Sequence, residues 1–293
     1  MDANVQHDAL SRRGFLALGG AGLATIGTGL VGGRAAHAET GEYPPSRDVT
    51  VRAMTYNIHA GQNANNVHDL EGIARVIEDS RPDIVGLQEV DVHWGARSGF
   101  EDQASLLARA LDMSVFFAPI LIYEPPAPGR PPRRFGCAVL SRHPMTYTEN
   151  HEIIRLEDWV APGFPEAVVQ VRGAKVHFYG THLDYRGDPT LRRMQVDDML
   201  AVTSADEGQK ILVGDLNAPP HAPELARLWG HFTDAWEVRG RGAGYTYASD
   251  DPVKRIDYVL CSPGVRVESV DVVETLASDH RPVVAELTLQ RGR

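Results

Sequence analysis

The sequence predicts an α/β domain built from more than one β-sheet. Short apolar runs alternate with amphipathic helical segments, and several of the runs end abruptly in polar side chains. Continuous apolar runs are typical of strands that are covered on both faces. The last two runs alternate apolar and polar residues, as in Val265-x-Val267, which indicates strands with one covered face. Strands that alternate with helices favour an α/β architecture.

Three helices are predicted from apolar residues at helical spacing. The first covers residues 69–80 and ends at Arg81-Pro82, since proline cannot continue a helix. The second covers residues 102–111 and the third residues 189–204. On the third helix, Leu191, Met194, Met199 and Leu200 are expected to face inward.

The predicted strands are short and mostly apolar. A proline-rich loop at residues 124–132 contains no residue suited to a core and is expected to be exposed. The strands are expected at residues 49–58, 84–87, 114–117, 135–141, 167–171, 175–182, 211–214, 256–261, 265–273 and 283–289.

The first 38 residues predict an export signal. Ser11-Arg12-Arg13-Gly14-Phe15-Leu16 places two arginines before a Gly- and Ala-rich apolar run, and cleavage is expected after Ala38. This is the pattern of a twin-arginine signal peptide, which is read by the twin-arginine translocation machinery. The alternative, a membrane anchor, is disfavoured because the run is short and rich in glycine. The prediction is a secreted, periplasmic or cell-envelope protein with a linker at 39–48 and one folded domain at 49–293.

The charge of the chain argues against a long nucleic acid as the main substrate. Removal of residues 1–38, with two acidic and three basic residues, changes the formal net charge from −10 to −11. Non-specific nucleic-acid binding depends on phosphate contacts and therefore on a basic face. Only small basic clusters occur, and they are Arg130, Arg133 and Arg134, and Arg186, Arg192 and Arg193.

The two cysteines are interpreted as free, buried residues. Cys137 and Cys261 both lie inside apolar, strand-like runs. Export would permit a disulfide, but small buried cysteines are common and no zinc-like Cys/His spacing is present.

Polar side chains follow the ends of five predicted strands. The most informative of these segments is Leu212-Val213-Gly214-Asp215-Leu216-Asn217. Each could be an ordinary turn residue, since Asp and Asn are common in turns. Together they suggest one shared site for a hard metal ion and for acid–base chemistry. His182 and Asp184 would share one strand face. Asp257 needs a partner if it is buried, and His280 would be a suitable one.

In this order, the segments around Asn57, Glu89, His182, Asp215 and Asp279-His280 resemble the endonuclease/exonuclease/phosphatase family. This family of metal-dependent phosphodiesterases includes pancreatic-type deoxyribonuclease, neutral sphingomyelinase and inositol polyphosphate 5-phosphatase. The resemblance runs from about residue 49 to residue 289. It implies a four-layer α/β sandwich of two packed mixed β-sheets flanked by helices.

The resemblance also implies roles for individual residues. Glu89 would be the principal metal ligand, with Asn57 and Asp279 nearby. Asp215 would orient or deprotonate the attacking water with help from Asn217. His280, paired with Asp257, would stabilise the charge of the transition state or act as a base, and His182 would donate to a phosphate oxygen or to the leaving group. Asp184, Arg134 and Arg186 are candidates for substrate binding.

The resulting hypothesis is an exported, divalent-metal-dependent phosphoric ester hydrolase, most simply a phosphodiesterase for small or lipid-linked phosphodiesters. Mg²⁺ is the expected cofactor, with Mn²⁺ or Ca²⁺ as alternatives. A secreted non-specific nuclease is the main alternative, with Arg133, Arg134 and Arg186 on backbone phosphates. A binding module without turnover ranks lower, because no member of the catalytic set is missing. Residues 93–101, 123–134 and 155–166 are expected to set specificity.

Overall fold

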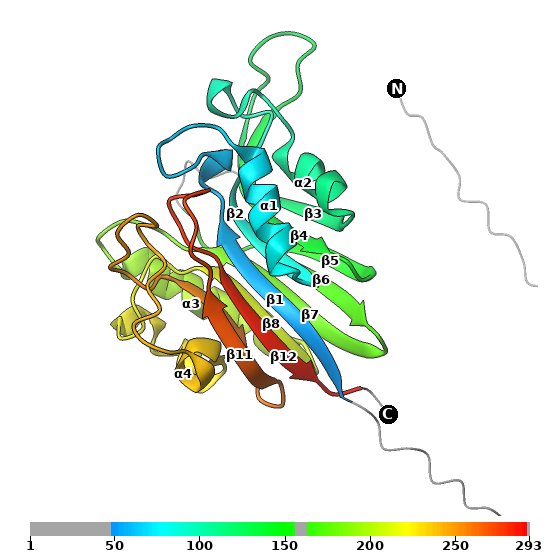
Figure 1. The fold of residues 1–293 in the computed structure, drawn as a ribbon, viewed down its shortest axis with the longest axis vertical. Coiled ribbons are helices and arrows are strands. Elements are labelled where there is room, and N and C mark those ends of the chain that lie inside the picture. Colours follow the sequence, from blue (N-terminus) through cyan, green and yellow to red (C-terminus); the bar gives the residue numbers. More distant parts are fainter. Residues whose placement is uncertain (1–47, 156–162, 292–293) are drawn as a thin grey trace, which may run out of the picture. The chain divides into compact units, whose positions relative to one another are not determined.

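Two six-stranded mixed β-sheets pack face to face in the computed structural model, which describes residues 48–155 and 163–291 (Figure 1). The predicted signal peptide at 1–38 and nearly all of the linker at 39–48 lie outside the described residues. In the part of the chain that is described, no helix combines the length and the apolar character needed to cross a membrane.

The first sheet contains strands from both ends of the domain. Its order is β11-β12-β1-β2-β4-β3, and β1 and β2 are its parallel pair. The strands are β1 (Val49–Asn57), β2 (Ile84–Val92), β3 (Ser114–Tyr123), β4 (Arg133–Ser141), β11 (Arg266–Val272) and β12 (Val283–Leu289).

The second sheet comes from the middle of the chain. Its order is β5-β6-β7-β8-β10-β9, and β7 and β8 are its parallel pair. The strands are β5 (Met145–His151), β6 (Phe164–Val171), β7 (Ala174–His182), β8 (Gln209–Asp215), β9 (Thr233–Asp234) and β10 (Asp257–Cys261).

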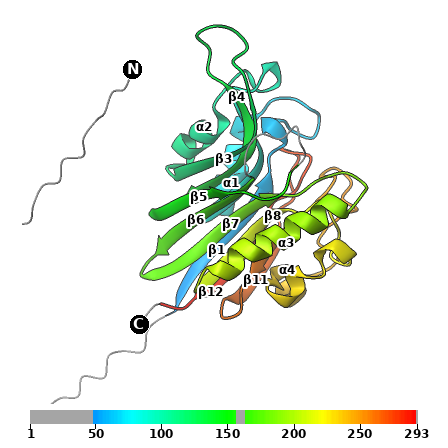
Figure 2. The same cartoon turned by 180° about the vertical axis from the view of Figure 1, so that it is seen from behind.

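Helices cover the outer faces of both sheets. Helices α1 (Leu70–Ser80) and α2 (Gln103–Leu111) pack on the first sheet, and α3 (Thr190–Ala205) packs on the second, as Figure 2 shows from behind. A short α4 (Ala235–Arg239) follows β9. Four 3₁₀ turns complete the described elements, and they are η1 (His59–Gly61), η2 (Ala96–Ser98), η3 (Pro223–Leu225) and η4 (Leu228–Gly230).

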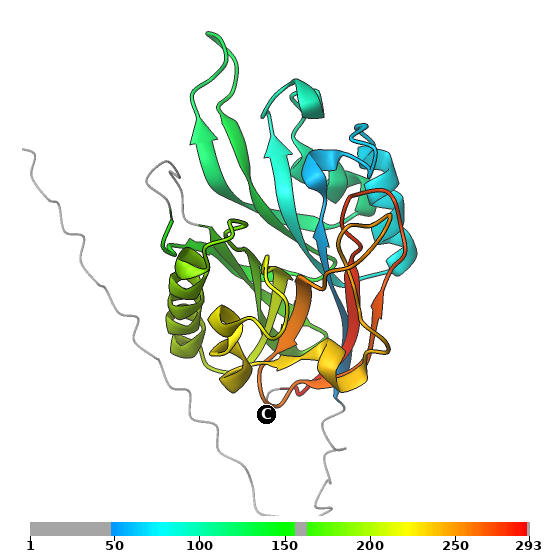
Figure 3. The same cartoon turned by 90° about the vertical axis from the view of Figure 1, so that its left-hand side faces the viewer.

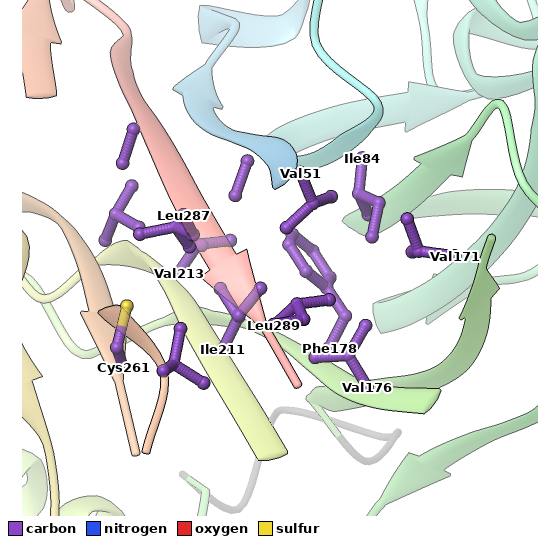
Figure 4. Close-up of a cluster of buried hydrophobic side chains, with 14 of the residues drawn as sticks. Val51, Ile84, Val171, Val176, Phe178, Ile211, Val213, Cys261, Leu287 and Leu289 are labelled. Carbon is purple, nitrogen blue, oxygen red and sulfur yellow. The ribbon is translucent and has the colours of Figure 1, made fainter. Parts of the chain in front are cut away.

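The main core lies between the sheets and consists of aliphatic side chains with Phe178 at its centre (Figure 4). Alternation along each strand separates this core from the outer ones. In β1, Val51 faces the other sheet, whereas Met54 and Tyr56 face the α1/α2 layer. Burial of apolar area on both faces of each sheet is the main stabilising contribution. The layers are therefore helices, sheet, sheet and helix, which confirms the four-layer α/β sandwich.

Helices α1 and α2 begin where the sequence places a capping carboxylate. Asp69 accepts a hydrogen bond from Gly72 N at 2.8 Å, and Asp102 accepts one from Ser105 N at 3.0 Å. Each carboxylate satisfies one of the backbone N–H groups that have no partner in the first turn of a helix.

Several predicted elements differ from the observed ones. Strands β2 and β3 extend well beyond residues 87 and 117, and the polar edge strand β5 was missed because its exposed side chains lack an apolar pattern. The prediction for α3 was wrong at Met194, which is 43% exposed. Arg192 instead turns inward, because its guanidinium reaches Glu224 Oε1 at 2.7 Å.

Two smaller sequence predictions concern exposed and buried positions. The loop at 124–132 is exposed throughout and lies at the tip of the β3–β4 hairpin, which projects beyond the rest of the first sheet (Figure 3). Cys137 and Cys261 are both free and buried, as expected. Burial raises the pKa of the Cys261 thiol to about 12, which keeps it protonated and unreactive.

Gly214 allows β7 and β8 to pair closely next to their polar ends. Its φ is +155°, and a Cβ at this position would lie 2.1 Å from the carbonyl oxygen of Thr181. We expect Gly214→Ala to lower the free energy of unfolding by about 1–3 kcal/mol, because a backbone clash cannot be relieved by a rotamer change. Urea denaturation measures this loss. Gly230→Ala, where a Cβ meets no atom within 4 Å, is the matched control. Equal midpoints for the two variants would contradict the explanation.

Candidate active site at the strand ends

His182, Asp215 and Asp257 lie side by side at one edge of the second sheet. Strands β7 and β8 are parallel, and His182 is the register partner of Asp215. Strand β10 runs antiparallel to β8 and begins at this edge, so Asp257 also pairs with Asp215. The sheet register therefore brings together three polar residues that lie far apart in the sequence.

Asn57 and Glu89 are contributed by the parallel pair of the first sheet. Asn57 is the last residue of β1, and Glu89 lies in β2 where the register with β4 shifts between Leu87 and Val90. Glu89 has a φ of +57°, which is unusual for a residue with a side chain. A β-bulge of this kind redirects a side chain. Strained backbone at a polar strand end also marks a candidate functional position.

The Asn57 side chain connects the two sheets. Its Nδ2 donates to Glu89 Oε1 at 3.0 Å and to Asp215 Oδ2 at 3.1 Å. Its Oδ1 accepts from His59 N at 3.1 Å. The amide nitrogen therefore faces the carboxylates, and the amide would have to turn before its oxygen could bind a metal ion. Ser278 Oγ donates to the backbone oxygen of Asn57 at 2.8 Å and holds the strand end in place.

His280 and Asp257 form the buried pair that the sequence suggested. His280 Nδ1 lies 2.9 Å from Asp257 Oδ2, and His280 Nε2 lies 3.8 Å from Asp215 Oδ2. The Tyr247 ring packs against the imidazole with 4.8 Å between the ring centroids. Asp257 therefore fixes the orientation of the ring and leaves Nε2 facing Asp215.

Neighbouring charges in the site shift one another's pKa values. Burial and the charge of Asp257 raise the pKa of Asp215 to about 6, against the opposing charges of His280 and His182. Burial disfavours the imidazolium of His280, but the charge and hydrogen bond of Asp257, together with the charge of Asp215, raise its pKa to about 10. Burial also disfavours the carboxylate of Glu89, yet His182 and Asn57 hold its pKa below the ordinary value. At neutral pH the metal-free site combines an imidazolium with several carboxylates.

These side chains open into one cleft with a volume of about 900 Å³. Glu89, His182, Asp215, Asn217, Asp279 and His280 all line it. Asn217 is oriented by its Nδ2, which donates to the Leu183 backbone oxygen at 3.0 Å, and its N–H donates to Asp215 Oδ1 at 2.8 Å. Asp279 Oδ1 lies 3.7 Å from His59 Nδ1. Asn57 and Asp257 lie behind these residues and support them.

The donor set suits a hard divalent cation. Glu89 and Asp215 both accept a hydrogen bond from the Asn57 amide. Within the described residues, all ion pairs of Asp215 and Asp279 are with histidines. Oxygen ligands are preferred by Mg²⁺ and similar ions, and buried carboxylates are stabilised by a nearby cation. Glu89 and Asp279 could bind the ion directly, and Asn57 could join them after rotation of its amide.

Three residues predicted to bind substrate lie outside the wall of this cleft. Asp184 follows the end of β7, is buried, and receives a hydrogen bond from Arg186 Nε at 2.8 Å. It therefore does not share a strand face with His182. Arg186 borders a separate hollow beside the start of α3. Arg134 lies over the Phe117 ring, with 5.7 Å between its Cζ and the ring centroid.

Sequence reasoning missed the aromatic wall of the cleft. Tyr185, Trp236, Tyr245 and Tyr247 line it together with Lys254, and most of these residues come from the segment between α4 and β10. Two tyrosines in Gly244-Tyr245-Thr246-Tyr247 were the available signal, but no regular pattern connects them to the strand ends. No described residue of 93–101, 123–134 or 155–166 is among the lining residues, although these loops were expected to set specificity.

The chain belongs to the Endonuclease/Exonuclease/phosphatase family, whose model matches residues 54–280. Members of this family are phosphoester hydrolases that depend on divalent metal ions. The predicted family membership is thus confirmed. No match is found among curated proteins.

Solved structures support the same assignment. An endonuclease/exonuclease/phosphatase from Beutenbergia cavernae is 27% identical with a TM-score of 0.70, and the match covers 82% of this chain and 72% of that one. The mannosyl-6-phosphatase Bt3783 of Bacteroides thetaiotaomicron is 17% identical with a TM-score of 0.62, over 81% of this chain and 99% of that one. The human Nocturnin catalytic domain with bound sulfate is 20% identical with a TM-score of 0.62, over 85% and 100%. The last two share the fold.

The His280–Asp257 pair predicts a pH response. Because the folded-state pKa of about 10 exceeds the ordinary 6.5, protonation of His280 stabilises the fold fully below about pH 6.5. That stabilisation is lost as the pH rises through about 10. In metal-free protein, Asp257→Asn should lower the pKa of His280, measured by NMR titration of its ring. Asp79→Asn, on the exposed side of α1, should leave it unchanged. A His280 pKa that is the same in all three proteins would contradict this account.

Proposed function

We propose that this chain is an exported, divalent-metal-dependent phosphodiesterase that hydrolyses small or lipid-linked phosphodiesters. The observation that carries the proposal is the contact of Asn57 Nδ2 with both Glu89 and Asp215, at 3.0 and 3.1 Å. It holds these two carboxylates together behind a cleft that they line with His182 and His280. This arrangement places two carboxylates and two imidazoles around a space large enough for a phosphoryl group.

The chemistry of a phosphodiester accounts for this set of groups. The substrate is anionic and repels hydroxide, so negative charge that develops on its oxygens has to be neutralised. A bound Mg²⁺ ion, held by Glu89 and Asp279, would supply part of this neutralisation and lower the pKa of a bound water. Mn²⁺ or Ca²⁺ could replace it, since both also accept oxygen ligands.

The side chains of the chain itself perform the remaining tasks. Asp215 is oriented by the Asn217 N–H and can accept a proton from the attacking water. His280, with Nδ1 fixed by Asp257, presents Nε2 to a non-bridging phosphoryl oxygen and stabilises its charge. His182 Nε2, 3.6 Å from Asp215 Oδ2, is placed to donate to the leaving oxygen.

The shape of the cleft supports a compact substrate. A volume of about 900 Å³ lies within the range that is typical of small-molecule sites. Tyr185, Tyr245 and Val253 are exposed on its wall and offer apolar area to the organic part of an ester. Arg255 also lines the cleft, but its guanidinium is engaged by Asp234 and by Glu237 at 2.6 Å. Lys254 is then the main cationic contact for an additional phosphate.

Two other activities have to be distinguished from this one. A non-specific nuclease would need basic contacts along a polynucleotide, and none of Arg133, Arg134 and Arg186 lines the cleft. A phosphomonoesterase is supported by the fold likeness to a protein named as a mannosyl-6-phosphatase. A binding module without turnover is disfavoured, because the complete set of catalytic residue types is present.

A substrate panel tests the proposal. Purified protein is assayed on bis-p-nitrophenyl phosphate, sphingomyelin, phosphatidylinositol, p-nitrophenyl phosphate, plasmid DNA and RNA, with Mg²⁺, Mn²⁺, Ca²⁺ or EDTA. We expect the highest kcat/KM on a small or lipid-linked diester, with loss in EDTA and recovery with Mg²⁺. Asp215→Asn should lower kcat by about 10²–10⁴-fold, because the water loses its base. Asp79→Asn serves as the surface control. Fastest cleavage of plasmid DNA or of the monoester would contradict the proposed substrate class, and no turnover on any substrate would contradict the enzyme.

Export by the twin-arginine route has a separate test. Replacement of both Arg12 and Arg13 by lysine keeps the charge of the segment but removes the arginine pair. We expect the wild-type chain outside the cytoplasm in a shortened form that begins after Ala38, and the double variant in the cytoplasm at full length. Cell fractionation with mass spectrometry of the N-terminus measures both. Equal export of the two proteins would contradict the twin-arginine assignment.

A further inference from the structure

A second cluster of titratable side chains lies on the outer face of the second sheet. Glu166 comes from β6, His177 from β7, and Asp206 directly follows the last residue of α3. Glu166 is the register partner of Tyr179, two residues after His177, so the side chains of Glu166 and His177 point to the same face. None of these residues lines the catalytic cleft.

Three potential ligand atoms of this cluster converge. His177 Nδ1 lies 2.6 Å from Glu166 Oε1 and 3.8 Å from Asp206 Oδ1. All three atoms lie within 4.8 Å of one another. In a tetrahedral site with bonds of about 2.0–2.1 Å, neighbouring ligand atoms are about 3.3 Å apart. The two observed distances lie on either side of this value, so small rotamer adjustments suffice to admit an ion.

The remaining oxygen of each carboxylate is held by a separate donor. His151 Nε2 lies 2.7 Å from Glu166 Oε2, and the Tyr179 hydroxyl donates to Asp206 Oδ2. The converging oxygens are therefore the ones that these donors leave free. Metal ligands in proteins are commonly oriented by such outer hydrogen bonds. The two carboxylates of the cluster thus have outer supporting groups.

Burial and charge favour a cation in this position. Glu166 is 2% exposed and His177 is 5% exposed. Within the described residues, the ion pairs of Glu166 and Asp206 are with histidines, and no lysine or arginine takes part. His177 Nε2 is buried without a hydrogen-bond partner, so the ring is oriented through Nδ1. Buried carboxylates without a permanent positive charge nearby gain stability from a bound metal ion.

We propose that Glu166, His177 and Asp206 form a second metal site, structural in role and suited to Zn²⁺ or a similar transition-metal ion. Imidazole together with carboxylates favours such ions over Mg²⁺. The ion replaces the proton at His177 Nδ1, which passes to solvent, and water completes the coordination. Its effect is to connect the end of α3 to β6 and β7. This site does not depend on the proposed function of the cleft.

A Zn²⁺ titration of the metal-free protein tests the site. The protein competes with a chelating dye for Zn²⁺, and excess Mg²⁺ is present. His280→Ala removes an imidazole from the cleft and should retain this Zn²⁺ ion. Asp206→Asn should weaken its binding at least tenfold, and Tyr179→Phe by about 10–100-fold, as expected for an outer-shell group. Asp197→Asn, on the exposed side of α3, is the matched control and should bind as the wild type does.

Two further readouts accompany the titration. Co²⁺ should give the visible absorption of a tetrahedral complex in wild type and in His280→Ala, but not in Asp206→Asn. Saturating Zn²⁺ should raise the Tm of the same two proteins, because a ligand that binds only the folded state stabilises it. The proposed site is disproved if the His280→Ala protein loses all of the Zn²⁺ that the wild-type protein binds. Wild-type affinity in Asp206→Asn would disprove it equally.

Discussion

The arrangement of the whole site depends on one buried electrostatic constraint between the two sheets. Glu89 belongs to the first sheet and Asp215 to the second, and both direct carboxylate oxygens at the Asn57 amide. The half-buried Glu89 carboxylate and the buried Asp215 carboxylate repel each other, and burial makes the repulsion stronger than in water. The amide, the imidazolium of His280 and a divalent cation are the groups that can offset that repulsion. The fold therefore creates a place where positive charge is stabilised.

The sheets hold these groups with little freedom. Strand β1 lies between β12 and β2, and its antiparallel pairing with β12 matches Thr55 with Val283. The segment that leads into β12 carries Ser278, Asp279 and His280, so this pairing brings it next to Asn57. On the other sheet, the register of β7, β8 and β10 aligns His182, Asp215 and Asp257. Regular backbone pairing thus positions the candidate catalytic side chains more rigidly than loops would.

The outer wall of the cleft is built differently from its floor. The floor consists of strand ends, whereas much of the wall comes from the irregular segment between α4 and β10. Such a segment can change without disturbing the register of either sheet. This division explains how one family fold can keep its phosphate chemistry while the organic part of the substrate varies.

Much of the floor was predictable from the sequence, and little of the wall was. Asp215 and Glu89 follow apolar runs, so their position at a strand end is a local property of the sequence. Glu166 and His177 carry no such signal, because their meeting depends on the register of β6 with β7. Asp184 and Arg186 contact each other over two residues and do not line the cleft, which no strand-end pattern in the sequence indicates. Tyr245 and Tyr247 reach the cleft through tertiary packing that no periodicity encodes.

A crystal structure of the protein soaked with Mn²⁺, with anomalous scattering used to locate the ion, would test the central claim most directly. We expect an anomalous peak in the cleft within about 2.0–2.3 Å of a Glu89 oxygen, with the Asp215 carboxylate on the side that faces the substrate. A cleft without Mn²⁺, in a crystal where Glu89 and Asp215 turn away from each other, would contradict it.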